Sequence, residues 1–173
     1  LPILITNCSN NYGPYQFPEK LIPLMIINCL EHKSLPIYGK GDNIRDWIYV
    51  DDHCKGIYEV LKNGKIGETY NLGGNQEMTN IDIVNNICLI LDKIIPSKKI
   101  NSYKELIVYV KDRPGHDFRY AIDSTKVENE LNFFPLETLE TGLKKTIMWY
   151  LDNLEWINKI RVDKYNQERL GNI

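Results

Sequence analysis

The sequence is poor in the residues that bind metals and form disulfides. It has four cysteines, none in a Cys-x-x-Cys pair, and three histidines without paired metal-ligand spacing. We therefore predict no metal site, and we interpret the cysteines as reduced thiols of a cytoplasmic protein. The residues concerned are Cys8, Cys29, Cys54, Cys88, His32, His53 and His116.

Long apolar runs and an excess of one charge are also missing. No run approaches the roughly 18 apolar residues of a membrane helix, and no signal-peptide pattern opens the chain. The 21 basic and 23 acidic residues give a net charge of -2, which argues against a nucleic-acid-binding protein. With 173 residues, 43% of them hydrophobic, the chain is long enough to bury a real core.

Alternating apolar patterns predict an α/β protein. We expect the last elements of a doubly wound sheet and a smaller α+β lobe that returns to it. Because the chain starts without Met inside a predicted strand, we expect a piece of a longer protein. Strands are predicted at 1–6, 34–39, 47–50, 67–74, 106–110 and 120–123, and helices at 17–32, 51–62, 81–95, 124–131 and 138–150.

The loop from Ser9 to Pro14 follows the first predicted strand and is rich in amides. Open α/β sheets bind ligands at the carboxyl ends of their strands, and neighbouring Asn side chains offer both donors and acceptors. The alternative is an Asx-rich turn without a ligand.

Three further places could bind an anion. Lys20 is expected in the first turn of a helix, where backbone N–H groups favour negative charge; it could equally be a solvated surface lysine. Arg45 could donate two hydrogen bonds to a phosphate, or it could form a weak surface contact with Asp46. The loop Arg113–His116 could clamp a diphosphate, or it could be a structural turn.

Two patterns resemble known motifs but are rejected. Gly39-Lys40-Gly41 begins like a dinucleotide fingerprint, but a strand and not a helix is expected to follow it. Tyr58 and Lys62 have the Tyr-x-x-x-Lys spacing of short-chain dehydrogenases, but they lie on a predicted amphipathic helix far from any cofactor motif. We interpret Tyr58 as a packing residue and Lys62 as a helix C-terminal charge. No arrangement predicts a hydrolytic triad.

Four segments, in order, carry a family resemblance. They are SNNYGPYQFPEKLIP (9–23), LPIYGKGDNIRDWIYVDDH (35–53), GETYNLGG (67–74) and DRPGHDFRYAID (112–123). Together they resemble the dTDP-glucose 4,6-dehydratases, which are extended short-chain dehydrogenases/reductases, over residues 1 to about 157. The resemblance implies a lyase in which NAD takes hydride from C4 of the glucose ring, water is lost across C5 and C6, and hydride returns to C6. It also implies a Rossmann-type sheet, a small α+β substrate-binding lobe interleaved with it up to residue 157, and a polar tail over 158–173. For the full-length family it implies a homodimer.

The resemblance implies roles for individual residues. Asn11 would contact the NAD cofactor and Asn10 the dTDP-sugar substrate. The nucleotide side would be formed by Lys20 and Leu21, the wall against the base by Pro36, Ile37 and Tyr38, and the diphosphate contact by Arg45. The nucleotide pocket would be completed by Asn80, Asp112, Arg113, Pro114, Gly115 and His116.

The chain departs from the family pattern in one large respect. The glycine-rich cofactor loop, the catalytic Tyr-x-x-x-Lys pair and the adjacent acidic residues lie, in family members, before the strand that opens this chain. The dimer helices also belong mainly to that missing half. We therefore expect a C-terminal half that recognises substrate and is inactive by itself. The alternatives are a non-catalytic nucleotide-sugar-binding remnant, or part of a UDP-sugar epimerase or decarboxylase.

Overall fold

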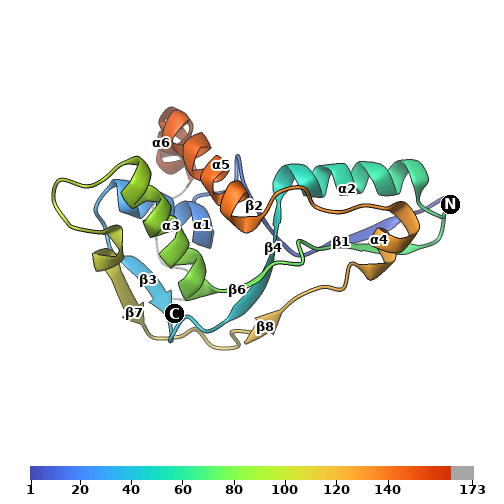
Figure 1. Cartoon of the computed structure of the whole chain (residues 1–173), viewed down its shortest axis with the longest axis horizontal. Coiled ribbons are helices and arrows are strands. Elements are labelled where there is room, and N and C mark those ends of the chain that lie inside the picture. The colour runs from blue at the N-terminus through green and yellow to red at the C-terminus, as the bar shows by residue number, and fades with distance from the viewer. Residues whose placement is uncertain (165–173) are drawn as a thin grey trace. The chain divides into compact units, whose positions relative to one another are not determined.

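The structure is a computed structural model that describes residues 1–164 (Figure 1); of residues 161–164 it describes the backbone alone. The strands are β1 (Ile5–Cys8), β2 (Asn10–Tyr12), β3 (Leu35–Tyr38), β4 (Ile44–Tyr49), β5 (Thr69–Leu72), β6 (Glu77–Thr79), β7 (Ile107–Val110) and β8 (Arg119–Tyr120). The helices are α1 (Leu21–Leu30), α2 (Val50–Asn63), α3 (Asn80–Ile94), the 3-10 helix η1 (Tyr103–Leu106), α4 (Thr125–Leu131), α5 (Leu139–Asp152) and α6 (Leu154–Lys164). The expected α/β class is confirmed.

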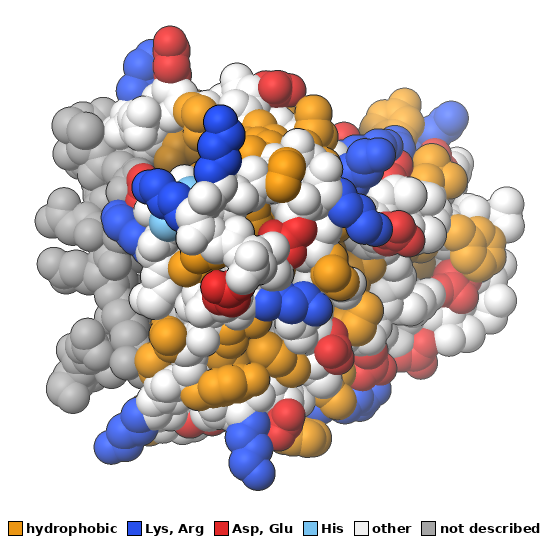
Figure 2. Space-filling model, turned by 60° about the vertical axis from the view of Figure 1, so that its left-hand side comes forward, with side chains coloured by type: hydrophobic (Ala, Val, Ile, Leu, Met, Phe, Trp, Pro, Cys, Tyr) orange, Lys and Arg blue, Asp and Glu red, His pale blue; other side chains and the backbone are white. Residues whose placement is uncertain are grey.

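These elements divide into two compact units, each built from three separate stretches of chain. Unit 1 comprises Leu1–Gly13, Asn43–Met78 and Asp117–Gly142. Unit 2 comprises Pro14–Asp42, Thr79–His116 and, among the described residues, the chain from Leu143 to Lys164. Basic and acidic side chains are interspersed on the face shown in Figure 2. Within residues 1–164, no helix combines the length and the apolarity that a membrane span requires.

Unit 1 contains two small sheets. In one, β1 runs parallel to β5, with Ile5 opposite Thr69; in the other, β4 lies between β2 and β6 and also pairs with β8. Helix α2 contacts both sheets, and α4 contacts β5 and α2. An added Cβ at Gly56 would lie 2.9 Å from the Phe133 ring, so glycine permits the close approach of α2 to the core. The core members are Val60, Tyr70, Leu72, Val127 and Phe133.

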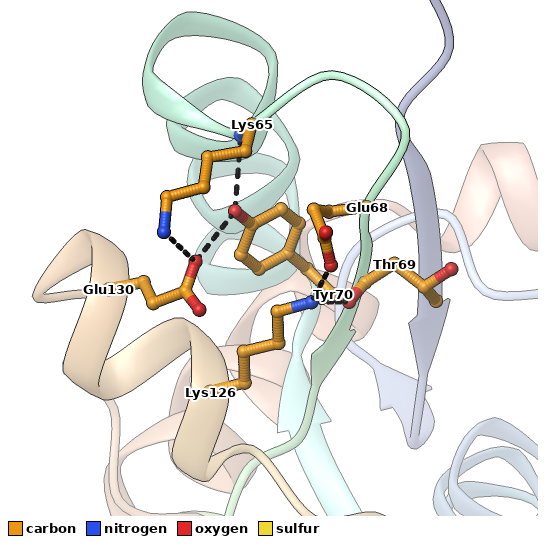
Figure 3. A network of polar contacts seen from close by, with 6 residues as sticks. All are labelled: Lys65, Glu68, Thr69, Tyr70, Lys126 and Glu130. Atoms are coloured by element: carbon orange, nitrogen blue, oxygen red, sulfur yellow. Dashed lines mark hydrogen bonds and ion pairs between the residues drawn. The ribbon is translucent and has the colours of Figure 1, made fainter.

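A polar network ties the turn after α2 to α4 (Figure 3). The Tyr70 hydroxyl accepts a hydrogen bond from the Lys65 backbone N–H at 3.1 Å and donates one to Glu130 at 3.0 Å. Lys126 lies 4.7 Å from the centre of the Tyr70 ring and forms an ion pair with Glu68 at 2.6 Å. The network fixes Tyr70 at both its ring and its hydroxyl while the ring fills the core.

A buried aspartate in β4 organises the loop between β5 and β6. Asp46 is 1% exposed; one carboxylate oxygen accepts the Gly74 N–H at 3.0 Å and the other accepts the Gln76 N–H at 2.7 Å. A second buried aspartate, Asp52 in α2, accepts the N–H groups of Leu136 and Glu137 at 2.9 and 2.8 Å. Hydrogen bonds to backbone donors offset the cost of burying these charges.

Unit 2 is built on a parallel pair of strands and two long helices. Strand β3 pairs with β7, with Leu35 opposite Ile107, and α1 packs against α3. Thr79 caps α3 by accepting the Asp82 N–H, as expected for a residue of this type before a helix. The fully buried side chains of the two helices form the core and include Ile22, Met25, Ile26, Cys29, Ile83, Ile87, Cys88 and Leu91.

Helix α1 begins later than predicted. It starts at Leu21 and not at Phe17, and Lys20 is an extended residue just before it, with ψ 155°. The placement of Lys20 in the first turn is therefore wrong. Pro23 is the third residue of α1, where no intrahelical N–H bond is required, so the proline is compatible with a helix that starts at Leu21.

Other predictions fail at strands and at one side chain. The first strand lies at 5–8 and not at 1–6, and the region 10–12, predicted as loop, forms β2. Tyr58 is 60% exposed, so its interpretation as a packing residue is wrong. Strand β4 and not a helix follows Gly39-Lys40-Gly41, which confirms the rejection of a dinucleotide fingerprint. Residues 165–173 of the predicted polar tail lie outside the described residues.

Candidate functional site

In unit 2, the ends of β3 and β7 bring three predicted site residues together. Tyr38 is the last residue of β3 and lies opposite Val110, the last residue of β7. The loop after β7 then returns so that the rings of His116 and Tyr38 meet edge to face, with centroids 6.2 Å apart. His116 Nδ1 lies 2.8 Å from a carboxylate oxygen of Asp112.

Two short contacts stabilise the ionised form of Asp112 in this cluster. The contact with His116, and then the Arg113 backbone N–H at 2.8 Å, lower the pKa of Asp112. The carboxylate is therefore ionised at neutral pH and can only accept hydrogen bonds. The proton of the His116–Asp112 contact consequently resides on Nδ1. Because Nδ1 is engaged by Asp112, Nε2 is the ring nitrogen that remains for a ligand. His116 is held firmly, since its side chain is only 5% exposed.

The rest of the Asp112–His116 loop is shaped by its backbone. Gly115 has φ +67°, and an added Cβ there would meet nothing within 4 Å, so glycine is required for the backbone angle and not for space. Pro114 fixes its own φ. The Arg113 side chain is exposed, which leaves the guanidinium accessible beside the ordered Asp112–His116 pair.

The predicted base wall on β3 has two faces. Ile37 is 1% exposed and belongs to the core, so only its backbone could meet a ligand. Pro36 and Tyr38 alternate with it and are partly exposed. The apolar wall available to a ligand therefore consists of Pro36 and Tyr38.

The remaining site residues of unit 2 stand at the N-terminal ends of two helices. Leu21 is the first residue of α1 and Asn80 the first residue of α3. Lys20 precedes α1 and pairs with Glu19 at 2.7 Å, with its side chain 55% exposed. This surface pair is worth little, so a stronger anion could displace Glu19 from Lys20.

In unit 1, the predicted site residues lie on strands β2 and β4. Asn10 and Asn11 are paired with Trp47 and Ile48 in the parallel register, and the Asn11 side chain donates to the Ser9 carbonyl at 3.1 Å. Arg45 is 9% exposed, which rules out the surface alternative. Its guanidinium donates to the carbonyls of Ile44 at 2.7 Å and Asp117 at 2.9 Å.

Three buried polar groups of unit 1 also lack a partner within residues 1–164, and two of them belong to the amide-rich segment 9–14. Ser9 Oγ, Tyr12 Oη and Trp47 Nε1 have no hydrogen-bond partner among the described residues. Burial raises the pKa of Tyr12, so its hydroxyl keeps its proton. Buried polar groups are rarely left unpaired, which makes this region of β2 and β4 a candidate surface for a polar ligand. Within residues 1–164, no group of three His, Cys, Asp or Glu side chains is arranged to hold a metal ion.

The chain is similar to known proteins in both sequence and fold. The family model described as GDP-mannose 4,6 dehydratase matches residues 1–146. A dTDP-glucose 4,6-dehydratase of Salmonella typhimurium is 59% identical over 165 residues, which are 95% of this chain and 45% of that protein.

Solved structures agree with the sequence comparison. The dTDP-glucose 4,6-dehydratase from Bacillus anthracis, in complex with NAD, has a TM-score of 0.82 and 50% identity over 92% of this chain and 48% of its own. The UDP-glucuronic acid 4-epimerase from Bacillus cereus, in complex with UDP-glucuronic acid and NAD, has a TM-score of 0.74 and 29% identity over 88% of this chain and 46% of its own. The chain thus spans about half the length of the relatives it matches.

Proposed function

The chain belongs to the family whose model is described as GDP-mannose 4,6 dehydratase, and from that membership we propose that it is the substrate-recognition portion of an NAD-dependent dTDP-glucose 4,6-dehydratase. The whole enzyme would convert dTDP-glucose to dTDP-4-keto-6-deoxyglucose and water. The observation that carries this proposal is the 59% identity to a dTDP-glucose 4,6-dehydratase over 95% of the chain.

The residues of unit 2 would hold the nucleotide. The partly exposed Pro36 and Tyr38 supply a flat apolar contact for thymine. Arg113 supplies charged donors for the diphosphate. His116, whose Nδ1–H is held by Asp112, would donate from Nε2 to the diphosphate in its imidazolium form. Lys20, Leu21 and Asn80, at the ends of α1 and α3, would complete the nucleotide contacts.

The residues of unit 1 would serve the sugar and the cofactor. Asn10 would contact the sugar, Asn11 the nicotinamide part of NAD, and Arg45 the diphosphate. When bound, NAD supplies the hydride acceptor and donor of the reaction. The buried, unpaired Ser9 hydroxyl beside Asn11 fits a polar group at this strand. No glycine-rich dinucleotide loop occurs in the 173 residues, so these side chains fit only a small part of NAD.

A reconstitution experiment tests the proposed function. The chain alone is expected to leave dTDP-glucose unchanged, because it carries none of the family's proton-transfer residues. Addition of a polypeptide with the cofactor-binding half of a relative should restore formation of the 4-keto sugar. Turnover by the isolated chain would contradict the proposal that this chain binds substrate while the other half of the enzyme carries the catalytic residues. Failure of the mixture to turn over, although it binds dTDP, would favour a non-catalytic nucleotide-sugar-binding protein.

The nucleotide site is tested by calorimetric titration with dTDP. We expect Arg113→Ala to weaken binding by roughly 1.5–3 kcal/mol, as for loss of a charged phosphate contact. Arg119→Ala is the matched control, since Arg119 is exposed and pairs with Glu77 at 2.6 Å. Equal affinities for the two variants would remove Arg113 from the site.

The alternative substrate class is a UDP-sugar. It is favoured by one observation, the similarity of fold to a UDP-glucuronic acid 4-epimerase at 29% identity. Titration of the chain with UDP beside dTDP separates the two classes, and tighter binding of UDP would favour an epimerase or a decarboxylase. A homodimer, a cytoplasmic location and the lack of a nucleic-acid partner stay predictions for the whole protein.

A further inference from the structure

The contact between Asp112 and His116 determines which ring nitrogen of His116 gains and loses a proton. His116 Nδ1 lies 2.8 Å from a carboxylate oxygen of Asp112. Because an ionised carboxylate only accepts hydrogen bonds, Nδ1 keeps its hydrogen in both charge states of the ring. The proton that a histidine exchanges near neutral pH is therefore, in this ring, the one on Nε2. Neutral His116 presents a lone pair at Nε2, and only the imidazolium form presents an N–H there.

We propose that Asp112 is a positioning residue, which acts through His116 and makes binding of the substrate diphosphate depend on the uptake of a proton. This inference rests on the proposed function, because it takes the diphosphate of the dTDP-sugar as the ligand of His116. A neutral ring would place the Nε2 lone pair against a phosphate oxygen, which can only accept a hydrogen bond. An imidazolium ring would instead donate a charge-assisted hydrogen bond to the same oxygen.

The Asp112–His116 pair is held in place from several directions. The Asp112 oxygen that contacts His116 also accepts the Arg113 backbone N–H at 2.8 Å. The other oxygen faces the turn after β3, since a Cβ added at Gly39 would lie 3.1 Å from it. The ring of His116 packs edge to face on Tyr38, and its side chain is only 5% exposed. A rotation of the ring that released Nδ1 from Asp112 would break these contacts.

The other charged groups around His116 keep their charge between pH 6 and 8. The hydrogen bond from His116, and then the Arg113 backbone N–H, lower the pKa of Asp112, so this carboxylate stays ionised. Lysine and arginine side chains remain positive in this range, and tyrosine hydroxyls remain neutral. The groups concerned are Tyr38 on β3, Lys40 and Asp42 in the turn after it, and Lys111 and Arg113 beside Asp112. The proton linkage is therefore assigned to His116.

The sign of the pH dependence follows from this linkage. Binding favours the imidazolium form, so the bound state holds more protons than the free protein wherever free His116 is neutral. The full affinity is present at a pH where free His116 is already protonated. It is lost as the pH rises and the proton has to be taken from solvent.

The test uses the full 173-residue chain and dTDP-glucose, whose diphosphate is substituted at both ends and does not titrate near neutral pH. Calorimetric titrations at pH 7.5 in two buffers with different ionisation enthalpies measure the protons taken up on binding. We expect about half a proton or more per bound dTDP-glucose, and a Kd about fivefold or more higher at pH 8 than at pH 6.

Three variants separate this role of Asp112 from a structural one. In Asp112→Asn the introduced amide can donate to Nδ1 as well as accept from it, so a neutral ring can carry its hydrogen on Nε2. Proton uptake and the pH dependence of Kd should then fall toward zero, and His116→Gln should remove both as well. His32→Gln is the matched control, because His32 also belongs to unit 2 but contacts Ser97 at 2.8 Å. This control should keep the proton uptake of the wild type.

Two results would overturn the proposal. One is a wild-type chain that binds dTDP-glucose without proton uptake and with the same Kd at pH 6 and 8, which would leave the proposed function intact. The other is an Asp112→Asn variant with the proton uptake of the wild type, since the carboxylate would then not control the ring. A chain that fails to bind dTDP-glucose at every pH would instead contradict the proposed function, and this inference with it.

Discussion

Replacement of Asp46 by asparagine exchanges one buried carboxylate oxygen for an amide group of the same shape. In the native protein, each of the two oxygens accepts a different backbone N–H, from Gly74 and from Gln76. An amide has one acceptor and one donor end. In either orientation of the introduced amide, one of the two backbone N–H groups therefore faces the amide NH₂, which is also a donor. The other backbone N–H keeps an acceptor, but this acceptor is the neutral amide oxygen.

The magnitude follows from those two bonds. A buried N–H without a partner costs about 1–3 kcal/mol, and a hydrogen bond that loses its charged acceptor weakens by roughly 1 kcal/mol. We expect Asp46→Asn to lower the free energy of unfolding by about 3 kcal/mol, which is roughly a hundredfold in the folding equilibrium. Because Asp46 is only 1% exposed, water cannot readily replace the lost acceptor.

Urea unfolding followed by tryptophan fluorescence measures the change, since Trp47 adjoins the substituted position. Amide hydrogen exchange at Gly74 and Gln76 should accelerate in the same variant. Asp42→Asn is the matched control, because Asp42 is exposed and its substitution should alter stability by less than about 0.5 kcal/mol. If Asp46→Asn unfolds at the same urea concentration as this control, the carboxylate does not hold the loop and the reasoning fails.

Three other features of unit 1 can be tested by substitution: a close backbone approach, an ion pair and an exposed apolar side chain. Gly74→Ala should unfold or severely destabilise the protein in a urea titration, because its Cβ would lie 1.8 Å from the Trp47 carbonyl oxygen; a wild-type midpoint would refute that steric argument. The contact with Arg119 lowers the pKa of Glu77 below its ordinary 4.5. The ion pair therefore stabilises the folded state above pH 4.5, and this stabilisation is lost as the pH falls through the lowered pKa of Glu77. Urea midpoints of wild type and Glu77→Gln should differ at pH 7 and converge in acid; a gap that persists at low pH would contradict the ion pair's role. Ile5→Lys should reduce self-association in light scattering, since Ile5 is 51% exposed on a strand paired on one edge alone within residues 1–164; a wild-type chain that is monomeric at high concentration would count against this.

Local sequence signals predict the helices well. The expected helix at 81–95 corresponds to α3, which spans Asn80–Ile94, because apolar side chains at helical spacing follow a threonine cap and a proline ends the run. Strand β3 is also predicted, since Leu35 and Ile37 alternate with more exposed residues. These elements are defined by patterns within a dozen residues.

Elements defined by distant partners escape prediction. Strand β2 consists of Asn10–Tyr12, polar residues that form a strand only because β4 lies beside them. The same holds for the buried Asp46, whose partners Gly74 and Gln76 lie about thirty residues along the chain. No local pattern reports such partners.

In the candidate site, too, residue types can be predicted from the sequence, whereas contacts between distant residues cannot. Arg113 and His116 are singled out by residue type, but the contact of His116 with Tyr38 depends on the pairing of β3 with β7. Family resemblance predicts a shared pocket for these residues where spacing could not. Neither approach indicates the unpaired Ser9 hydroxyl or the core position of the Ile37 side chain, because both depend on packing.

The threading of the chain through the two units bears on its synthesis. Unit 1 is completed by Asp117–Gly142 and unit 2 by residues that follow Leu143, so both units need segments that the ribosome makes after strand β7. Until those segments have been made, the apolar side chains of the preceding stretches lack part of the packing that covers them in the folded units. Both units are therefore expected to finish folding late in the synthesis of this stretch, which leaves the partly made polypeptide prone to aggregation.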